Sequence, residues 1–355
     1  MNRKICRIVS LLFALVFLLS SLGGVTAAEE LHAFPRTKAE EKEYITKIAE
    51  EIDVEGREFT VAYEYALNCF TSQKSYVLYE LSPSGYAIYD QISGIVEELI
   101  LDSDNPYKEV KNGTMFYGGP MNYIAKLDNK YLLINENTEL SERDVVELTS
   151  LEAFTVENRQ KTAKGNPSST EYYYMSSSTY FTSLLGDKFG TNTTGTCTQL
   201  ACAIMLGFYD VYVNSQFVPD GYRDGYGTTQ AFHLYLQTFM GTSGCFLSNA
   251  ASGLNSYFSA IFFSLPTAYY NSNNHNTVFT KVSNRVYNNR PTVISMFSYY
   301  NPSCPINHSV VAYGYRTEIT GGVMTSAAYF VHNGWHNTKL GTYAWDWFRD
   351  DLYIS

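Results

Sequence analysis

The chain is poor in cysteine, in positive charge and in long apolar runs. Its 355 residues include 6 cysteines, and 25 lysines and arginines stand against 35 aspartates and glutamates. So few cysteines exclude a disulfide-dense scaffold, and whether Cys245 and Cys304 pair stays open. The shortage of basic side chains leaves no basic patch, so neither nucleic acid nor an anionic membrane surface is expected as a partner.

Only one apolar run approaches membrane-spanning length, and it lies at the N-terminus. Three basic residues precede it, Leu11–Leu19 forms its core, and small residues follow up to Ala28. This order is typical of a secretory signal peptide over residues 1–28, and the core is too short for a comfortable membrane span. We therefore expect a secreted, extracellular protein without a membrane span, while attachment to the cell surface stays open.

Charge divides the rest of the chain into two parts. Residues 29–165 hold 26 acidic and 14 basic side chains, whereas residues 166–355 hold 9 and 8. Apolar periodicity predicts helices in the first part at 37–53 and 142–154. Alternating apolar residues predict antiparallel strands there, at 58–67, 75–82, 85–90 and 130–135. The first part is therefore predicted to be an α+β domain, and it has no catalytic constellation of its own.

The second part is also predicted to be α+β, with helices before strands. Residues 156–178 lead into it and, being charged and then rich in Gly, Pro and Ser, predict an exposed connector open to proteases. The expected helices lie at 197–212, 229–240, 248–261 and 278–289. A strand series starts at 291–298 and includes the segments SVVAYGY and SAAYFVH.

Cys197 has the sequence context of a reactive thiol. It starts the segment CTQLACAIMLGFYD, whose apolar residues fall at helical spacing, and Gly195 and Thr196 ahead of it suit a helix N-cap. The positive partial charge of a helix N-terminus stabilises a thiolate and lowers the pKa of the thiol. Cys202 is the rival nucleophile, but mid-helix amides are already bonded, so packing is its expected role.

Two later segments supply the partners that such a thiol needs. His308 is the first residue of the apolar segment HSVVAYGY. Asn333 follows a second apolar segment and lies within the sequence HNGW. His308 would hold Cys197 as a thiolate and then protonate the leaving amine. Asn333 would accept a hydrogen bond from the other ring nitrogen, and Trp335 would shield that bond from water. The N–H of Cys197 would face the oxyanion.

The segments around Cys197, His308 and Asn333 resemble those of the papain-like cysteine peptidases, and among them the bacterial streptopain and double-glycine leader peptidases. GTCTQLACAIMLGFYD resembles the nucleophile helix of the family, NHSVVAYGY its histidine strand and HNGW its asparagine segment. The resemblance implies Cys197, His308 and Asn333 as catalytic residues. The family's oxyanion glutamine is missing, and Asn192 is the candidate that replaces it.

The resemblance also implies that the two parts have different functions. Residues 166–355 would form the papain-like domain, with the cysteine on its helix-rich part and the histidine and asparagine on its antiparallel sheet. Residues 29–165 would form a smaller α+β pro-region that acts as an intramolecular inhibitor. Because this region is acidic, acidification is predicted to loosen it as carboxylates protonate.

Metal chemistry is not expected from the remaining polar residues. His332 and His336 are four residues apart but lack the intervening glutamate of a zinc-protease helix. Asp220 and Asp224 lie in a segment rich in Gly and Tyr that lacks the regularly spaced oxygen ligands and the closing glutamate of a calcium-binding EF-hand loop. No metal or other cofactor is therefore predicted.

The sequence thus predicts a secreted bacterial cysteine peptidase, made as a zymogen and acting on proteins or peptides. Two alternatives remain open. A cell-wall amidase or another thiol acyl-transferase would use similar chemistry. A papain-like binding module with inactive chemistry would present Tyr and Asn side chains to a partner or glycan, and an unreactive Cys197 would indicate it.

Overall fold

The computed structural model describes nine stretches of the chain, which are residues 36–53, 55–69, 75–150, 169–183, 195–223, 230–262, 266–296, 308–334 and 341–355. The predicted signal peptide lies outside these residues. Within the nine stretches, no helix combines the length and apolarity that a membrane crossing requires.

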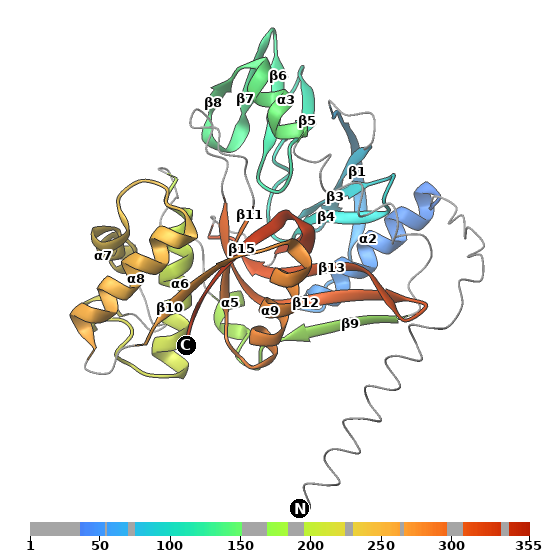
Figure 1. Cartoon of the computed structure of the whole chain (residues 1–355). Coiled ribbons are helices and arrows are strands. Elements are labelled where there is room, and N and C mark those ends of the chain that lie inside the picture. The colour runs from blue at the N-terminus through green and yellow to red at the C-terminus, as the bar shows by residue number, and fades with distance from the viewer. Residues whose placement is uncertain are drawn as a thin grey trace, which may run out of the picture. The chain divides into compact units, whose positions relative to one another are not determined.

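One antiparallel sheet includes strands from both halves of the chain (Figure 1). Its order is β1-β2-β3-β4-β14-β13-β12-β11-β15-β10, and β9 pairs with β12 beside this path. The first half contributes β1 (Thr60–Leu67), β2 (Tyr76–Ser82), β3 (Tyr86–Asp90) and β4 (Ile95–Ile100). The second half contributes β9 (Ser169–Tyr174), β10 (Ala268–Ser272), β11 (Thr292–Met296), β12 (Ser309–Thr320), β13 (Val323–His332), β14 (Gly341–Ala344) and β15 (Phe348–Ile354).

The two halves meet edge to edge at β4 and β14. Gly341 of β14 lies opposite Ile100 of β4, and Tyr343 lies opposite Glu98. Every residue of β4 is buried, although two of its six residues are glutamates. Residues Pro35–Ser355 accordingly form one compact unit. The predicted division into pro-region and catalytic domain stays a prediction, and the sheet crosses its boundary.

A second sheet belongs to the first half alone. It has the order β5-β6-β7-β8. Its elements are β5 (Thr114–Tyr117), β6 (Tyr123–Leu127), β7 (Lys130–Leu133), the 3₁₀ helix η1 (Ile134–Glu136) and β8 (Thr138–Leu140), followed by α3 (Glu142–Ser150). A small separate core holds it together, made of Phe116, Ile124, Tyr131, Leu133, Leu140 and Val145. Together with the main sheet and the helices, it confirms the α+β class with antiparallel strands.

A helix lies close to each predicted position, and the short helix α5 (Thr179–Ser183) was not predicted. α2 (Lys38–Ile52) starts with a capping box, in which Thr37 and Glu40 bond each other's backbone N–H. The others are α5 (Thr179–Ser183), α6 (Cys197–Tyr212), α7 (Gln230–Met240), α8 (Leu247–Ile261) and α9 (His275–Tyr287), with 3₁₀ helices η3 (Asp220–Tyr222) and η4 (Trp345–Trp347). The helix predicted over 197–212 is confirmed at both ends.

α6 is buried over most of its length. All its residues from Cys197 to Asp210 are buried. The helix contacts α7 and α8 as well as β11 and β12, so it lies between the other helices and the sheet. Neighbours therefore cover α6 on every side from Cys197 to Asp210.

Part of the predicted connector is a strand. Residues 169–174 form β9, which pairs with β12 from Gly314 to Ile319. The tyrosines in this segment explain the difference, because Tyr172 and Tyr174 stack on Phe330 of β13, at ring-centroid distances of 6.4 and 4.4 Å. Residues 156–168 of the predicted connector lie outside the described residues.

Candidate active site

Cys197 is the first residue of α6, and a tight turn leads the chain into it. Gly195 has a φ of +66°, a left-handed conformation that glycine adopts without strain. Thr196 is the N-cap residue as predicted, but its side chain makes no capping hydrogen bond. Cys197 itself is only 7% exposed. The predicted position of the cysteine at a helix start is confirmed.

Backbone N–H groups surround the thiol. Those of Ser309 and Thr198 donate hydrogen bonds to Cys197 Sγ, and the Thr198 side chain also makes a hydrogen bond with the thiol, all of which favours the thiolate. Burial is the larger effect, and it raises the pKa of the Cys197 thiol above its usual value. The predicted lowering of this pKa is therefore wrong for this structure. The sequence indicates the helix start but not the burial around it.

His308 and Asn333 are in contact. His308 immediately precedes β12, Asn333 immediately follows β13, and these two strands pair antiparallel. His308 Nε2 lies 3.1 Å from the backbone oxygen of Asn333. This contact uses the main-chain carbonyl, whereas the sequence predicts one from the side chain. Asn333 Nδ2 donates to the hydroxyl of Tyr343 on β14, at 3.5 Å.

Burial also keeps the imidazole uncharged. His308 is 6% exposed and Asn333 is 3% exposed. Burial lowers the pKa of His308 to about 4, and the hydrogen bond with the Asn333 carbonyl opposes this only in part. At neutral pH the Cys197 thiol and the His308 ring are therefore both neutral in this structure. The thiolate–imidazolium pair would need a more open, wetter site.

A chain of hydroxyls joins the start of α6 to the sheet. Thr198 Oγ1 donates to the carbonyl oxygen of Cys245 and lies equally close to Ser309 Oγ, both at 2.9 Å. Ser309 Oγ lies 3.3 Å from Ser295 Oγ on β11. The first residue of β12 is thereby fixed against the second residue of α6.

Gln199 fixes the loop that connects α7 with α8. Its Nε2 donates to the carbonyl oxygens of Gly241 at 2.9 Å and Ser243 at 2.7 Å. Gln199 is fully buried. Sequence reasoning missed this residue and Thr198. The signal for both is a pair of polar side chains directly after Cys197, in a helix that is otherwise apolar up to Phe208.

The other cysteines of the second half have environments of their own. Cys202 is fully buried in α6, which agrees with the predicted packing role. Cys245 has a free thiol. Burial and the nearby Cys197 raise the pKa of Cys245 to about 12, so it is a poor nucleophile. Cys304, its predicted candidate partner, lies outside the described residues.

The residues weighed for metal binding do not converge in the described part of the chain. No group of three or more His, Cys, Asp or Glu there could hold a metal ion. His332 Nδ1 accepts a hydrogen bond from the N–H of Gly334 at 3.2 Å, and Asp220 pairs with Arg223. Four further residues named from the sequence lie outside the described residues, namely Asn192, Asp224, Trp335 and His336.

A second polar cluster lies where the first half meets β14. Glu98 of β4 is fully buried. Its carboxylate accepts hydrogen bonds from three tyrosine hydroxyls, those of Tyr86 (3.0 Å), Tyr117 (3.3 Å) and Tyr123. Burial raises the pKa of Glu98 to about 7, and these hydroxyls lower it in part. Because Tyr343 lies opposite Glu98, the cluster reaches the side chain of Asn333.

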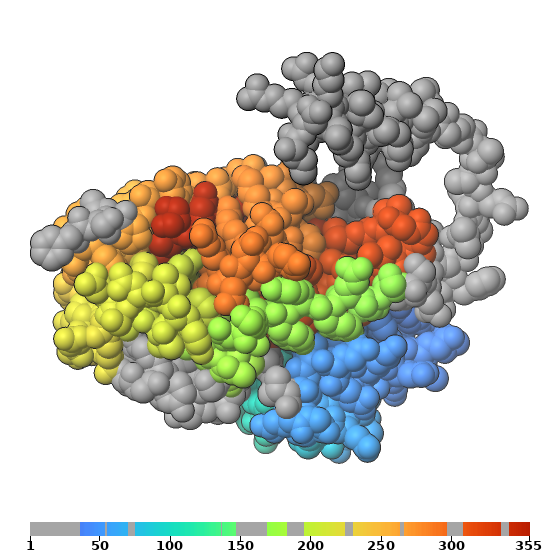
Figure 2. Space-filling model, turned by 90° about the horizontal axis from the view of Figure 1, so that it is seen from below, coloured from blue at the N-terminus to red at the C-terminus, as the bar shows by residue number. Residues whose placement is uncertain are grey.

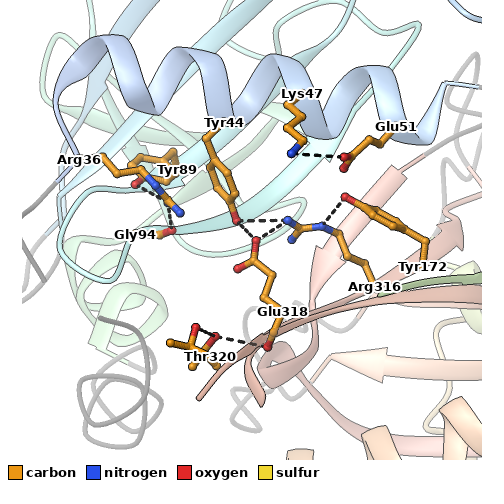
Figure 3. Close-up of polar contacts among 11 residues, drawn as sticks. Arg36, Tyr44, Lys47, Glu51, Tyr89, Gly94, Tyr172, Arg316, Glu318 and Thr320 are labelled. Atoms are coloured by element: carbon orange, nitrogen blue, oxygen red, sulfur yellow. Dashed lines mark hydrogen bonds and ion pairs between the residues drawn. The ribbon is translucent and has the colours of Figure 1, made fainter. Parts of the chain in front are cut away.

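Two more contacts hold the first half to the second half. Trp347 Nε1 in η4 donates to the buried carboxylate of Glu97, at 2.9 Å. On α2, the Tyr44 hydroxyl donates to Glu318 of β12 at 2.7 Å, and Glu318 also pairs with the buried Arg316 (Figure 3). In the space-filling view, blue residues of the first half lie directly beside the green residues of β9 (Figure 2).

Comparisons with known proteins leave the family open. No protein-family model matches the chain, and no curated protein matches it. A solved structure of a mutant fragment of prointerpain A from Prevotella intermedia is similar, with a TM-score of 0.40 and 11% identity. The similarity covers 82% of this chain and 98% of that one. A likeness this distant assigns no family to the chain.

Proposed function

We propose that the chain is a secreted cysteine peptidase of papain-like architecture, made as a zymogen. Cys197 is the nucleophile, His308 the general base and acid, and Asn333 the residue that orients His308. One observation carries the proposal. The starts of α6 and β12 meet at the thiol, because the N–H of Ser309, directly after His308, donates to Cys197 Sγ. The same histidine contacts Asn333.

In the proposed reaction, His308 accepts the thiol proton as Cys197 Sγ attacks the scissile carbonyl carbon. The N–H of Cys197 faces the oxyanion, and Asn192 is the proposed second donor. The protonated His308 then gives its proton to the leaving amine as the C–N bond breaks, which leaves a thioester. His308 next deprotonates a water molecule, which hydrolyses the thioester and returns the free thiol.

Latency of the precursor is part of the proposal. A thiolate is the attacking species in cysteine chemistry, and burial keeps the Cys197 thiol and the His308 ring neutral. Residues 29–165 would act as the pro-region, holding β14 through β4 and holding β12 through α2. Cleavage within residues 156–168 would precede opening of the site to solvent, where the pKa values of both groups return toward their usual range.

Turnover of defined substrates tests this proposal. Purified protein, cut in the connector, is assayed on casein and on peptidoglycan as wild type, Cys197→Ala and Cys202→Ala. We expect casein hydrolysis by the wild type and by Cys202→Ala, with loss of at least about a thousandfold in Cys197→Ala. Equal activity of Cys197→Ala and the wild type would overturn the assignment of the nucleophile. Release of peptidoglycan fragments without casein hydrolysis would indicate the amidase.

The inactive binding module is the second candidate. The neutral, buried thiol and imidazole favour it, because an inactive site has no need to form a thiolate–imidazolium pair. Alkylation of Cys197 in the cut protein separates the two candidates. A peptidase reacts quickly near neutral pH, whereas the binding module reacts only as the pH approaches the raised pKa of its thiol.

A further inference from the structure

We propose that Thr198 is a positioning residue, which locks the nucleophile helix to the histidine strand and so keeps the Cys197 thiol aligned with His308. The catalytic consequence rests on the peptidase function proposed above. The positioning of the thiol by Thr198 does not rest on that function, because the reactivity of Cys197 can be measured without any substrate.

One hydroxyl joins three segments. Thr198 Oγ1 donates to the carbonyl oxygen of Cys245, in the loop before α8, at 2.9 Å. The same oxygen lies 2.9 Å from Ser309 Oγ on β12, and the Thr198 side chain also makes a hydrogen bond with the Cys197 thiol. The loop, α6 and β12 therefore meet at one side chain.

The position of Ser309 gives this contact its importance. Ser309 directly follows His308, and its N–H donates to Cys197 Sγ. Its hydroxyl lies between Thr198 Oγ1 and Ser295 Oγ, at 2.9 and 3.3 Å. A shift of Ser309 away from Thr198 would therefore move the thiol's hydrogen-bond donor and the adjacent imidazole together.

Burial strengthens the lock. Thr198 and Ser309 are each 2% exposed, so water does not readily replace the lost partner when one hydroxyl is removed. Thr198→Val would leave the carbonyl oxygen of Cys245 without its donor and the hydroxyl of Ser309 without its contact to Thr198. A buried polar group that loses its partner costs more than an exposed one, and a reacting group misplaced by about 1 Å loses on the order of a hundredfold in rate.

The chain contains a matched control in Thr292. This threonine is fully buried on β11, the strand that also carries Ser295. Its hydroxyl has no hydrogen-bond partner within the described stretches. Thr292→Val therefore makes the same chemical change at the same depth without removing a contact.

The experiment compares wild type, Thr198→Val, Thr198→Ser and Thr292→Val in the full chain, cut in the connector. It measures kcat and KM on a peptide substrate, and the pH profile of iodoacetamide alkylation at Cys197 by mass spectrometry. We expect Thr198→Val to lose roughly tenfold to a hundredfold in kcat, with KM changed less than about threefold. Its alkylation profile should shift to higher pH. Thr198→Ser should restore both readouts, and Thr292→Val should match the wild type.

Either of two results would overturn the proposal. One is an unchanged kcat and an unchanged pH profile of alkylation in Thr198→Val, and the other is a failure of Thr198→Ser to restore both. If Thr198→Val does not fold, Ser309→Ala removes the same contact from the opposite side and takes its place. If the wild type turns over no substrate, the peptidase function fails. The alkylation profiles of the same variants then still decide whether Thr198 positions the thiol.

Discussion

The buried carboxyl of Glu98 makes the stability of the chain depend on pH in an unusual direction. Burial raises the pKa of Glu98 from 4.5 to about 7 in the folded protein. The folded state thus binds the proton more tightly than the unfolded chain does. The contribution of Glu98 to the free energy of unfolding is then highest below about pH 4.5, and it is lost as the pH rises through the folded pKa near 7. At this group acidification tightens the fold, which is the reverse of the loosening predicted from the acidic composition.

The size of the effect follows from the difference between the two pKa values. A rise of about 2.5 pKa units corresponds to about 3 kcal/mol of stability lost above pH 7. Glu98→Gln keeps the shape of the side chain and a hydrogen-bond acceptor but takes up no proton. We therefore expect the unfolding free energy of Glu98→Gln to rise relative to wild type by about 3 kcal/mol between pH 4 and pH 8.

Urea denaturation at several pH values, followed by fluorescence, measures this difference. Glu64→Gln is the control, since the pKa of the exposed Glu64 is lowered to about 2 by Lys38 and Lys42. Its effect should have the opposite sign and be much smaller, because solvent screens exposed pairs. A difference between Glu98→Gln and wild type that stays constant within about 1 kcal/mol from pH 4 to pH 8 would refute the reasoning.

Two further substitutions test a contact between the two halves of the chain and the backbone beside the site. Tyr44→Phe removes the donor to the buried Glu318 and should lower the unfolding free energy by about 1–3 kcal/mol. Urea denaturation beside the exposed Tyr63→Phe checks it, and equal losses would contradict it. Gly334→Ala places a Cβ at a φ of +74° and 2.9 Å from Leu200 Cδ2. It should destabilise by more than about 1 kcal/mol and slow alkylation of Cys197, and unchanged melting and alkylation would argue against this.

Helices could be predicted because their signals are local. The sequence from Cys197 to Tyr212 shows both the start of a helix and the helical spacing of its apolar residues, and α6 has those bounds. β15 was not predicted, because two aspartates interrupt its apolar residues. Its Asp351 is fully buried, and this is possible because Arg285 of α9 pairs with it. A partner 66 residues away in the chain leaves no trace in the local pattern.

The same contrast holds at the candidate site. The order of Cys197, His308 and Asn333 is visible in the sequence, and the structure places the last two in contact. The burial that raises the thiol pKa is not visible there, because it depends on how the elements pack around α6. The residues around Glu98 do not predict the pairing of β4 with β14 either. The buried carboxylate of Glu98 accepts hydrogen bonds from tyrosines on three other strands, and these partners cannot be read from the local sequence.

Covalent labelling of the site tests the central claim most directly. A peptide carrying a thiol-reactive electrophile is added to the protein after cleavage of the connector, for wild type, Cys197→Ala and His308→Ala. Intact mass and peptide mapping then locate the label. The account predicts one label per chain, on Cys197, which is absent in Cys197→Ala and at least about a hundredfold slower in His308→Ala. Labelling on Cys202 or Cys245, or labelling of Cys197 at the same rate without His308, would contradict it.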